Sequence, residues 1–246
     1  MKNVLTLILL GCFMFSCQST SNKPGDFKLL PLPQQFEISG KSEIDYKSVE
    51  TYFSPQNVKL PVLGNLLKNI KSANEKSKAD IICSIDESLD TKAEGYTLNI
   101  SEKQISITGK DNAGLFYGFK TLEQLLQDAK DQNVFLPMCS IVDYPSLAYR
   151  AIHLDIKHHI DNTEYYYDLM DWLSSYKING IIVELEDKLK YERQPVVGGK
   201  DALSIEEWQK LSNYAKERNI EISPLVQGLG HAAFILKHKE YEHLRD

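Results

Sequence analysis

The sequence predicts an α/β protein in two parts, an α+β domain followed by an incomplete (β/α)8 TIM barrel. In the first part, short segments alternate hydrophobic and polar residues, which is typical of strands with one buried face. From about Tyr149, apolar strands instead alternate with amphipathic helices, a pattern that indicates a parallel sheet. Polar residues follow two of these apolar strands, at the ends where β/α barrels carry their sites.

The first residues predict an export signal that does not belong to the fold. Lys2 is followed by the apolar run Val4–Phe15, which is too short for a membrane span of about 20 residues but suits a signal peptide. Cys17 follows this run and precedes polar residues, an arrangement that resembles a bacterial lipoprotein signal. We expect residues 1–17 to be a lipoprotein signal in which cleavage before Cys17 leaves its thiol to be acylated, and residues 18–27 to be a linker.

Two alternatives for this segment remain open. The signal could be an ordinary secretory one in which Cys17 is incidental, or cleavage could occur before Cys12. In each case we expect an exported protein. A lipid anchor at Cys17 would hold it in the cell envelope, on the periplasmic side or at the cell surface.

Residues 28–141 are predicted to form the α+β domain. Asp111 is expected to cap a helix, because apolar residues follow it at helical spacing as far as Leu126. A second helix is expected over Leu60–Ala73. Strands are expected at Ile81–Ile85, Tyr96–Ile100 and Ile105–Thr108. Cys83 and Cys139 lie in strand-like contexts and are expected to be small buried residues, although an export compartment would also permit a disulfide.

Residues 142–246 are predicted to form a partial barrel, with Asp143-Tyr144-Pro145 at its boundary. The expected elements are strands at Ala151–Ile156, Gly180–Leu185 and Glu221–Val226, helices at Asn162–Lys177 and Ser204–Arg218, and a third helix from Ala232. A closed barrel needs eight strands, and three alone would leave an open edge. We therefore expect the amino-terminal portion of a longer gene product; association with a partner at that edge is the alternative.

Composition excludes several classes of function. The net charge is −6, spread along the chain without a basic stripe, which argues against nucleic-acid binding. The hydrophobic share of 42% and charged share of 25% are typical of a globular protein rather than a disordered or membrane-spanning one. Lys157, His158 and His159 resemble metal ligands only superficially, since adjacent side chains diverge and no third ligand is suitably spaced. We expect neither a metal nor a cofactor.

The candidate site residues lie at the ends of the predicted barrel strands. Asp187 follows the second strand and His231 the third, so the two should lie on one rim and could pair as carboxylate and imidazole. Glu184 lies three residues before Asp187 and should face the other way unless the strand ends first. Asp155 shares a face with His153 and should point into the barrel mouth or pair with a basic neighbour, because a carboxylate in an apolar strand is costly alone.

Several motifs resemble family 20 of the glycoside hydrolases, and within it the hexosaminidase D-like branch. In the barrel part they are Glu184-Leu185-Glu186-Asp187, Leu203-Ser204-x-x-Glu207 and Ile222-Ser223-Pro224-Leu225-Val226-Gln227-Gly228-Leu229-Gly230-His231. In the first part they are Pro31-Leu32-Pro33-Gln34, Glu94-Gly95-Tyr96 and Asp111-x-Ala113-Gly114-Leu115-Phe116-Tyr117-Gly118. The likeness covers nearly all of residues 29–246.

The resemblance implies a β-N-acetylhexosaminidase acting on glycans that contain N-acetylhexosamine. In this family the acetamido oxygen of the substrate attacks the anomeric carbon, an exception to the two-carboxylate scheme. Asp187 and His231 match the supporting aspartate and histidine. An arginine that contacts the sugar in other members is replaced here by His158. We predict that His158, Asp155 and Glu184 bind substrate.

The resemblance also implies what these 246 residues lack. The catalytic Asp-Glu pair of the family lies beyond the third barrel strand, and no such pair follows His231. We therefore expect the chain to be inactive alone, because general acid catalysis needs its acid. The alternatives are a non-catalytic surface lipoprotein that binds amino sugars or a partner, and a different acetamido-sugar hydrolase family. The first barrel strand of that second family should contain Arg-Gly-x-x-Glu-Gly, which Arg150–Asp155 does not fit.

Overall fold

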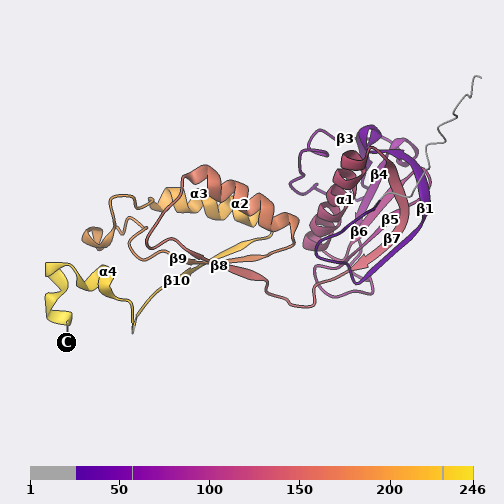
Figure 1. Ribbon diagram of the computed structural model, residues 1–246. Coiled ribbons are helices and arrows are strands. Elements are labelled where there is room, and N and C mark those ends of the chain that lie inside the picture. The colour runs from indigo at the N-terminus through magenta and orange to yellow at the C-terminus, as the bar shows by residue number, and fades with distance from the viewer. Residues whose placement is uncertain (1–25, 57, 229, 246) are drawn as a thin grey trace, which may run out of the picture.

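A computed structural model describes residues 26–245 apart from 57 and 229 (Figure 1). The predicted signal with Cys17, and all but the last two residues of the predicted linker, lie outside the described residues. The described chain is a mixed α/β structure with two sheets, each covered on one face by helices. Within the described ranges, no helix is both apolar and long enough to span a bilayer.

The first sheet has seven strands in the order β1-β7-β5-β6-β4-β2-β3. Antiparallel pairs join β1 to β7, β7 to β5 and β5 to β6, whereas β6, β4, β2 and β3 run parallel to one another. The strand bounds are β1 (Gln35–Asp45), β2 (Thr51–Phe53), β3 (Lys71–Ser72), β4 (Ile81–Ile85), β5 (Tyr96–Ile100), β6 (Ile105–Gly109) and β7 (Phe135–Asp143). The three strands expected in this region are confirmed.

Helix α1 (Asn112–Gln132) covers one face of this sheet and closes its hydrophobic core. Asp111 caps it as predicted, accepting a hydrogen bond from the Gly114 backbone N–H at 2.7 Å. Gly114 is needed for close approach, since a Cβ there would lie 2.1 Å from the Gly95 carbonyl oxygen. The helix therefore lies directly against the turn before β5.

The predicted helix over Leu60–Ala73 is wrong. The segment contains turns and ends in the short strand β3. Leu60, Leu63 and Leu66 pack against the core as the apolar spacing suggested. However, Gly64 carries the conformational cost that disfavours helix interiors. The apolar side chains therefore pack against the core as expected, although the backbone of this segment is not helical.

The second sheet has three parallel strands in the order β10-β9-β8, joined by helices as the sequence predicts. Helices α2 and α3 cover the same face of this sheet (Figure 1). The elements are β8 (Ala151–Asp155), α2 (Thr163–Ser175), β9 (Gly180–Glu184), α3 (Ile205–Lys216), β10 (Glu221–Leu225) and a short α4 (Ala233–Leu236). Asn162 caps α2, and Ser204 with Glu207 forms a capping box on α3.

The register of this sheet separates an apolar face from a polar one. Ile152, Ile181 and Ile222 are paired in one row, and they belong to or pack against the core under the helices. Three residues further along, Asp155 pairs with Glu184, which pairs with Leu225. Because successive side chains alternate between faces, the two carboxylates lie on the face away from the helices.

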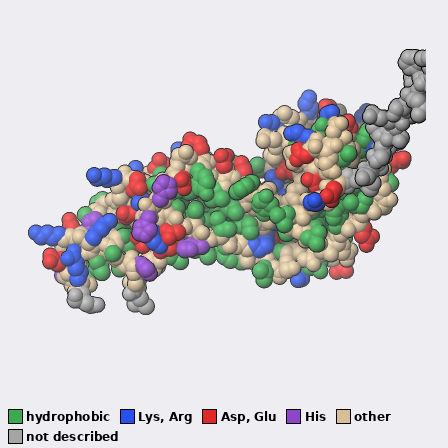
Figure 2. Space-filling model, in the orientation of Figure 1, with side chains coloured by type: hydrophobic (Ala, Val, Ile, Leu, Met, Phe, Trp, Pro, Cys, Tyr) green, Lys and Arg blue, Asp and Glu red, His purple; other side chains and the backbone are tan. Residues whose placement is uncertain are grey.

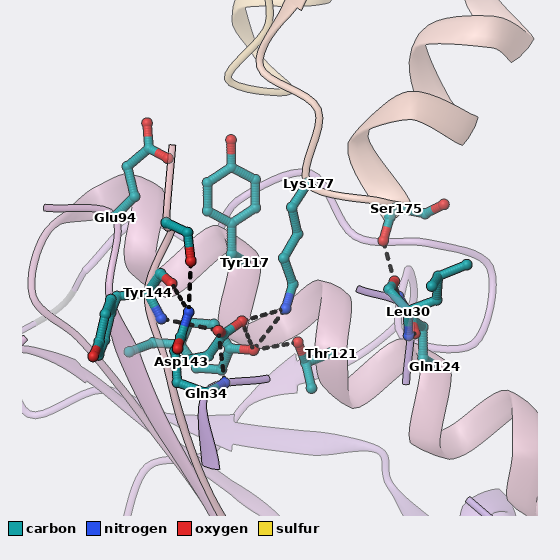
Figure 3. A network of polar contacts seen from close by, with 12 residues as sticks. Leu30, Gln34, Glu94, Tyr117, Thr121, Gln124, Asp143, Tyr144, Ser175 and Lys177 are labelled. Carbon is teal, nitrogen blue, oxygen red and sulfur yellow. Dashed lines mark hydrogen bonds and ion pairs between the residues drawn. The ribbon is translucent and has the colours of Figure 1, made fainter. Parts of the chain in front are cut away.

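A polar interdomain network joins the two sheets at the amino ends of β8 and β9; we define it as Glu94, Tyr96, Asp143, Arg150, Lys177 and Asn179. Lys177 Nζ lies 2.6 Å from Asp143 Oδ2 and 2.9 Å from the Tyr96 hydroxyl, and both charged side chains are buried (Figure 3). Arg150 Nη2 lies 2.6 Å from Glu94 Oε2. Asn179 Nδ2 donates to Glu94, and its Oδ1 accepts from the Arg150 backbone N–H at 2.7 Å.

The two cysteines of the first domain are buried free thiols. Cys83 belongs to β4 and Cys139 to β7. Burial raises the pKa of Cys83 to about 11 and that of Cys139 to about 12. The expectation of small buried residues is confirmed, and no disulfide joins them.

Candidate functional site

The carboxyl ends of β8, β9 and β10 gather the polar residues predicted for the site. Because the three strands are parallel neighbours, the loops that follow them leave the sheet at one rim. Asp187 comes three residues after the end of β9, and His231 six residues after the end of β10. The prediction that their strands are adjacent and parallel is confirmed.

Glu184 is the most connected residue at this rim. It is the last residue of β9, and its side chain is 6% exposed. Oε1 accepts from Lys157 Nζ at 3.0 Å and from Gln227 Nε2 at 2.6 Å, while Oε2 lies 3.2 Å from His153 Nε2. These donors, with Lys157 first, lower the pKa of Glu184. We call His153, Asp155, Lys157, Glu184 and Gln227 the mouth cluster.

Asp155 lies beside Glu184 and is more open. Its side chain is 41% exposed, and its Oδ2 lies 2.7 Å from Lys157 Nζ. Its Oδ1 also accepts from the Lys157 backbone N–H at 3.1 Å. The hydrogen bond from the Lys157 ammonium is the main reason that the pKa of Asp155 lies below its ordinary value. The expectation of a basic neighbour is met by Lys157, while the exposed part of the carboxylate remains accessible at the rim.

Asp187 lies between two lysines. Its Oδ1 lies 3.0 Å from Lys188 Nζ and its Oδ2 lies 3.4 Å from Lys237 Nζ. Burial opposes ionisation, but the two ammonium groups outweigh it, so the pKa of Asp187 is lowered. Oδ1 is buried and has no hydrogen-bond donor of good geometry among the described residues. The contact of this oxygen among the described residues is the ion pair with the Lys188 ammonium.

His231 is exposed and has a positive φ of 54° after Gly230. Among the described residues, no hydrogen bond or ion pair joins it to Asp187. The strand order brings the two loops to one rim, while the imidazole itself lies in solvent. Its supporting role stays a prediction.

His158 is also exposed, in the loop after β8. All six histidines of the chain fall between residues 153 and 243. Those visible in Figure 2 gather at the end of the molecule away from the α+β domain, among acidic and basic side chains. Across the described ranges, no three His, Cys, Asp or Glu side chains are grouped as a metal site requires.

Sequence reasoning missed four contributors to this rim: Lys157, Lys188, Gln227 and Lys237. A usable signal existed for Lys157, because two residues after Asp155 is the spacing that returns to the same side of an extended chain. Gln227 had a similar signal as a polar residue just beyond β10. Lys237 had none, since its contact with Asp187 depends on how the α4 segment folds back.

Comparison with known proteins finds relatives for both parts of the chain. Residues 26–144 match the model of "Glycosyl hydrolase family 20, domain 2". A β-hexosaminidase of Porphyromonas gingivalis is 30% identical over 236 residues, covering 83% of this chain and 30% of the relative. Hexosaminidase D of Bos taurus is 34% identical over 98 residues, covering 39% of this chain and 28% of the relative.

Solved structures agree in fold. The β-N-acetylhexosaminidase of Bacteroides fragilis superimposes with a TM-score of 0.70 at 19% identity, covering 89% of this chain and 48% of that one. A family 20 exo-β-N-acetylglucosaminidase of Vibrio harveyi in complex with N-acetylglucosamine gives 0.65 at 22% identity, covering 85% and 38%. The chain spans about a third or less of the length of these curated relatives. The resemblance predicted from the motifs is confirmed: the chain belongs to glycoside hydrolase family 20, the β-hexosaminidase family.

Proposed function

We propose that the chain contributes part of the site of a β-N-acetylhexosaminidase. Such an enzyme hydrolyses terminal β-linked N-acetylhexosamine with the help of the substrate's own acetamido group. The observation that carries this proposal is the polar rim at the carboxyl ends of three parallel β/α units, in a chain related to β-hexosaminidases. On this reading β8, β9 and β10 are the first three strands of a (β/α)8 barrel, whose sites lie at that rim.

Asp187 and His231 have the supporting role in this proposal. Asp187 Oδ1 is ion-paired with Lys188, and its second lone pair could receive an imidazole N–H from the loop after β10. Such a hydrogen bond would orient the imidazole and stabilise its protonated form. A pair of this kind would then tune the acid that protonates the leaving group.

Substrate binding is assigned to Asp155 and His158 by direct contact and to Glu184 through the residues it holds. Asp155 and His158 are open to solvent at the rim, where they can hydrogen-bond sugar hydroxyls. Glu184 is buried under its own donors, so it acts on substrate chiefly by holding those donors in place.

Titration of the chain with N-acetylglucosamine, monitored by NMR chemical shifts, tests this proposal. We expect the largest shifts at the rim residues and weaker binding for Asp187→Asn. The distant control Asp86→Asn should bind as the unmodified chain does. Shifts confined to the α+β domain, or none, would contradict the proposal. Because no Asp-Glu pair follows His231, we expect these 246 residues alone to leave a chromogenic N-acetylglucosaminide uncleaved.

Export as a lipoprotein is proposed from the sequence of residues 1–17 alone. Cys17 would carry the lipid, and the following polar residues would be the tether. Metabolic labelling with a radioactive fatty acid in a bacterial host tests this, with Cys17→Ser as the variant and Cys12→Ser as its control. Equal labelling of the Cys17→Ser protein would disprove the assignment.

A further inference from the structure

The α+β domain carries a groove lined by three lysines from separate parts of the chain. We call it the basic groove and define it by Lys47, Lys71 and Lys130, which line a hollow of about 530 Å³. Lys71 begins the edge strand β3, and Lys130 lies in the last turn of α1. Asn65 and Asn69 also line this hollow and add side-chain amides to it.

The charge of the basic groove is opposite to that of the whole chain. Its three lysines are exposed, and within the described ranges none of them forms an ion pair, whereas other lysines of this domain do. Glu50 is the one carboxylate among the described lining residues. The chain as a whole carries a net charge of −6. A local excess of unpaired cations on an acidic protein favours an anionic partner.

The basic groove lies near the point where the described chain begins. The Asp26 backbone N–H donates to Gln132 Oε1 at 2.8 Å, and Gln132 Nε2 donates to the Asp26 carbonyl oxygen at 2.8 Å. Gln132 is the last residue of α1 and follows closely after Lys130. Residues 18–25 separate Asp26 from Cys17, and a chain of that length spans at most about 30 Å. A lipid on Cys17 would therefore hold this end of the domain close to a membrane.

We propose that the basic groove binds the phosphate groups of anionic lipid headgroups and so docks the α+β domain on a membrane surface. Ammonium groups and side-chain amides both donate hydrogen bonds to phosphate oxygens. Because an anchor on Cys17 would raise the local concentration of headgroups, even weak contacts of this kind would be occupied.

This inference goes beyond the proposed hydrolase activity, because it concerns how the protein is held rather than what its rim binds. The polar rim lies beyond the interdomain network, toward the other end of the described chain (Figure 1). A protein docked through the basic groove would therefore keep its rim away from the lipid.

Co-sedimentation of the full chain with lipid vesicles tests the proposal. The test compares vesicles of equal parts phosphatidylglycerol and phosphatidylcholine with vesicles of phosphatidylcholine alone. The apolar run Val4–Phe15 acts on both, so the ratio of the two affinities measures the effect of headgroup charge. We expect this ratio to fall about fivefold for each single variant and about a hundredfold for the triple variant. These variants are Lys47→Gln, Lys71→Gln and Lys130→Gln. Replacing all three by arginine should retain the ratio.

The matched control replaces three exposed lysines of the barrel part, which changes the net charge equally. Lys200→Gln, Lys210→Gln and Lys216→Gln together should leave the ratio nearly unchanged. An equal fall in this control would assign the effect to net charge and would overturn the proposal, as would a ratio near one for the unmodified chain.

Two further measurements separate the headgroup from other sources. Inorganic phosphate, compared with chloride at equal ionic strength, should leave the ratio unchanged. Loss of the ratio in phosphate would assign the groove to a soluble phosphate ligand and would overturn the proposal. Cys17→Ser should show the same ratio as the unmodified chain, because the groove and not the acyl group senses headgroup charge. A ratio that disappears with Cys17 would contradict this.

Discussion

The same three-stranded sheet carries a polar cluster at each end, and the two clusters differ in burial. At the amino ends of the strands, the interdomain network buries Lys177 and Asp143 and gives each several partners. At the carboxyl ends, the mouth cluster leaves Asp155 and His153 about half exposed. The buried arrangement is typical of a rigid domain interface, and the more exposed one is typical of groups that are available to a ligand.

This difference in burial predicts which property of the protein, stability or ligand binding, each cluster affects. A buried charge that loses its partner is left without solvent, so damage to the interdomain network should appear as lost stability. The exposed charges of Asp155 and His153 are screened by water, so changes to these two residues should alter binding and titration with little effect on folding. The following predictions separate the two clusters, beginning with the largest effect.

Lys177→Met should lower the free energy of unfolding by about 3 kcal/mol, since it leaves the buried Asp143 carboxylate without its ammonium. Urea denaturation measures this loss. Lys177→Met with Asp143→Leu should recover much of it, because both charges are then removed together. The exposed control Lys103→Met should lose under about 0.5 kcal/mol. A loss as small as this for Lys177→Met would show that the network does not stabilise the domain interface.

Arg150→Met should cost about 2 kcal/mol, because the guanidinium donates to Glu94 and to the carbonyl groups of Leu147 and Lys177. Arg150→Lys should restore only part of the stability, since an ammonium cannot reproduce the planar fork of donors. Full rescue by lysine in the same urea experiment would show that charge alone matters here.

Stability should also fall on acidification through the lowered pKa values of Asp155, Glu184 and Asp187. A carboxyl whose pKa is lowered in the folded state stabilises fully above its ordinary pKa and loses that contribution as the pH falls through the folded value. We expect the urea midpoint to decline below about pH 4.5. Glu184→Gln should make this decline shallower; an unchanged slope would place the responsible carboxylates elsewhere.

Lys237→Met should have the smallest effect on folding, within about 0.5 kcal/mol, because Lys237 is mostly exposed. It should nevertheless raise the pKa of Asp187, which loses one of its two ammonium neighbours. NMR titration of Asp187 gives the second readout. A large loss of stability without a change in this titration would contradict the distinction between the buried interdomain network and the more open charges at the carboxyl rim.

Local sequence pattern was sufficient for most of the elements. The strands at Ile81–Ile85 and Tyr96–Ile100 have the predicted bounds, and Asp111 caps its helix, because alternation and capping act between residues near in the chain. The failure at Leu60–Ala73 has the same origin. Apolar spacing there predicted burial correctly, but burial alone does not select helical backbone where Gly64 disfavours it.

By itself, the sequence determined the family, the alternation of strands and helices, and the rim on which Asp155, Glu184, Asp187 and His231 lie. Only the tertiary structure decided which side chains meet: Lys157 and Gln227 on Glu184, Lys237 on Asp187, and Lys177 on Asp143. Periodicity specifies the face that a residue occupies, but the partner of a charged group depends on which loops fold together. These contacts join residues that are far apart in the chain, so local sequence patterns do not specify them.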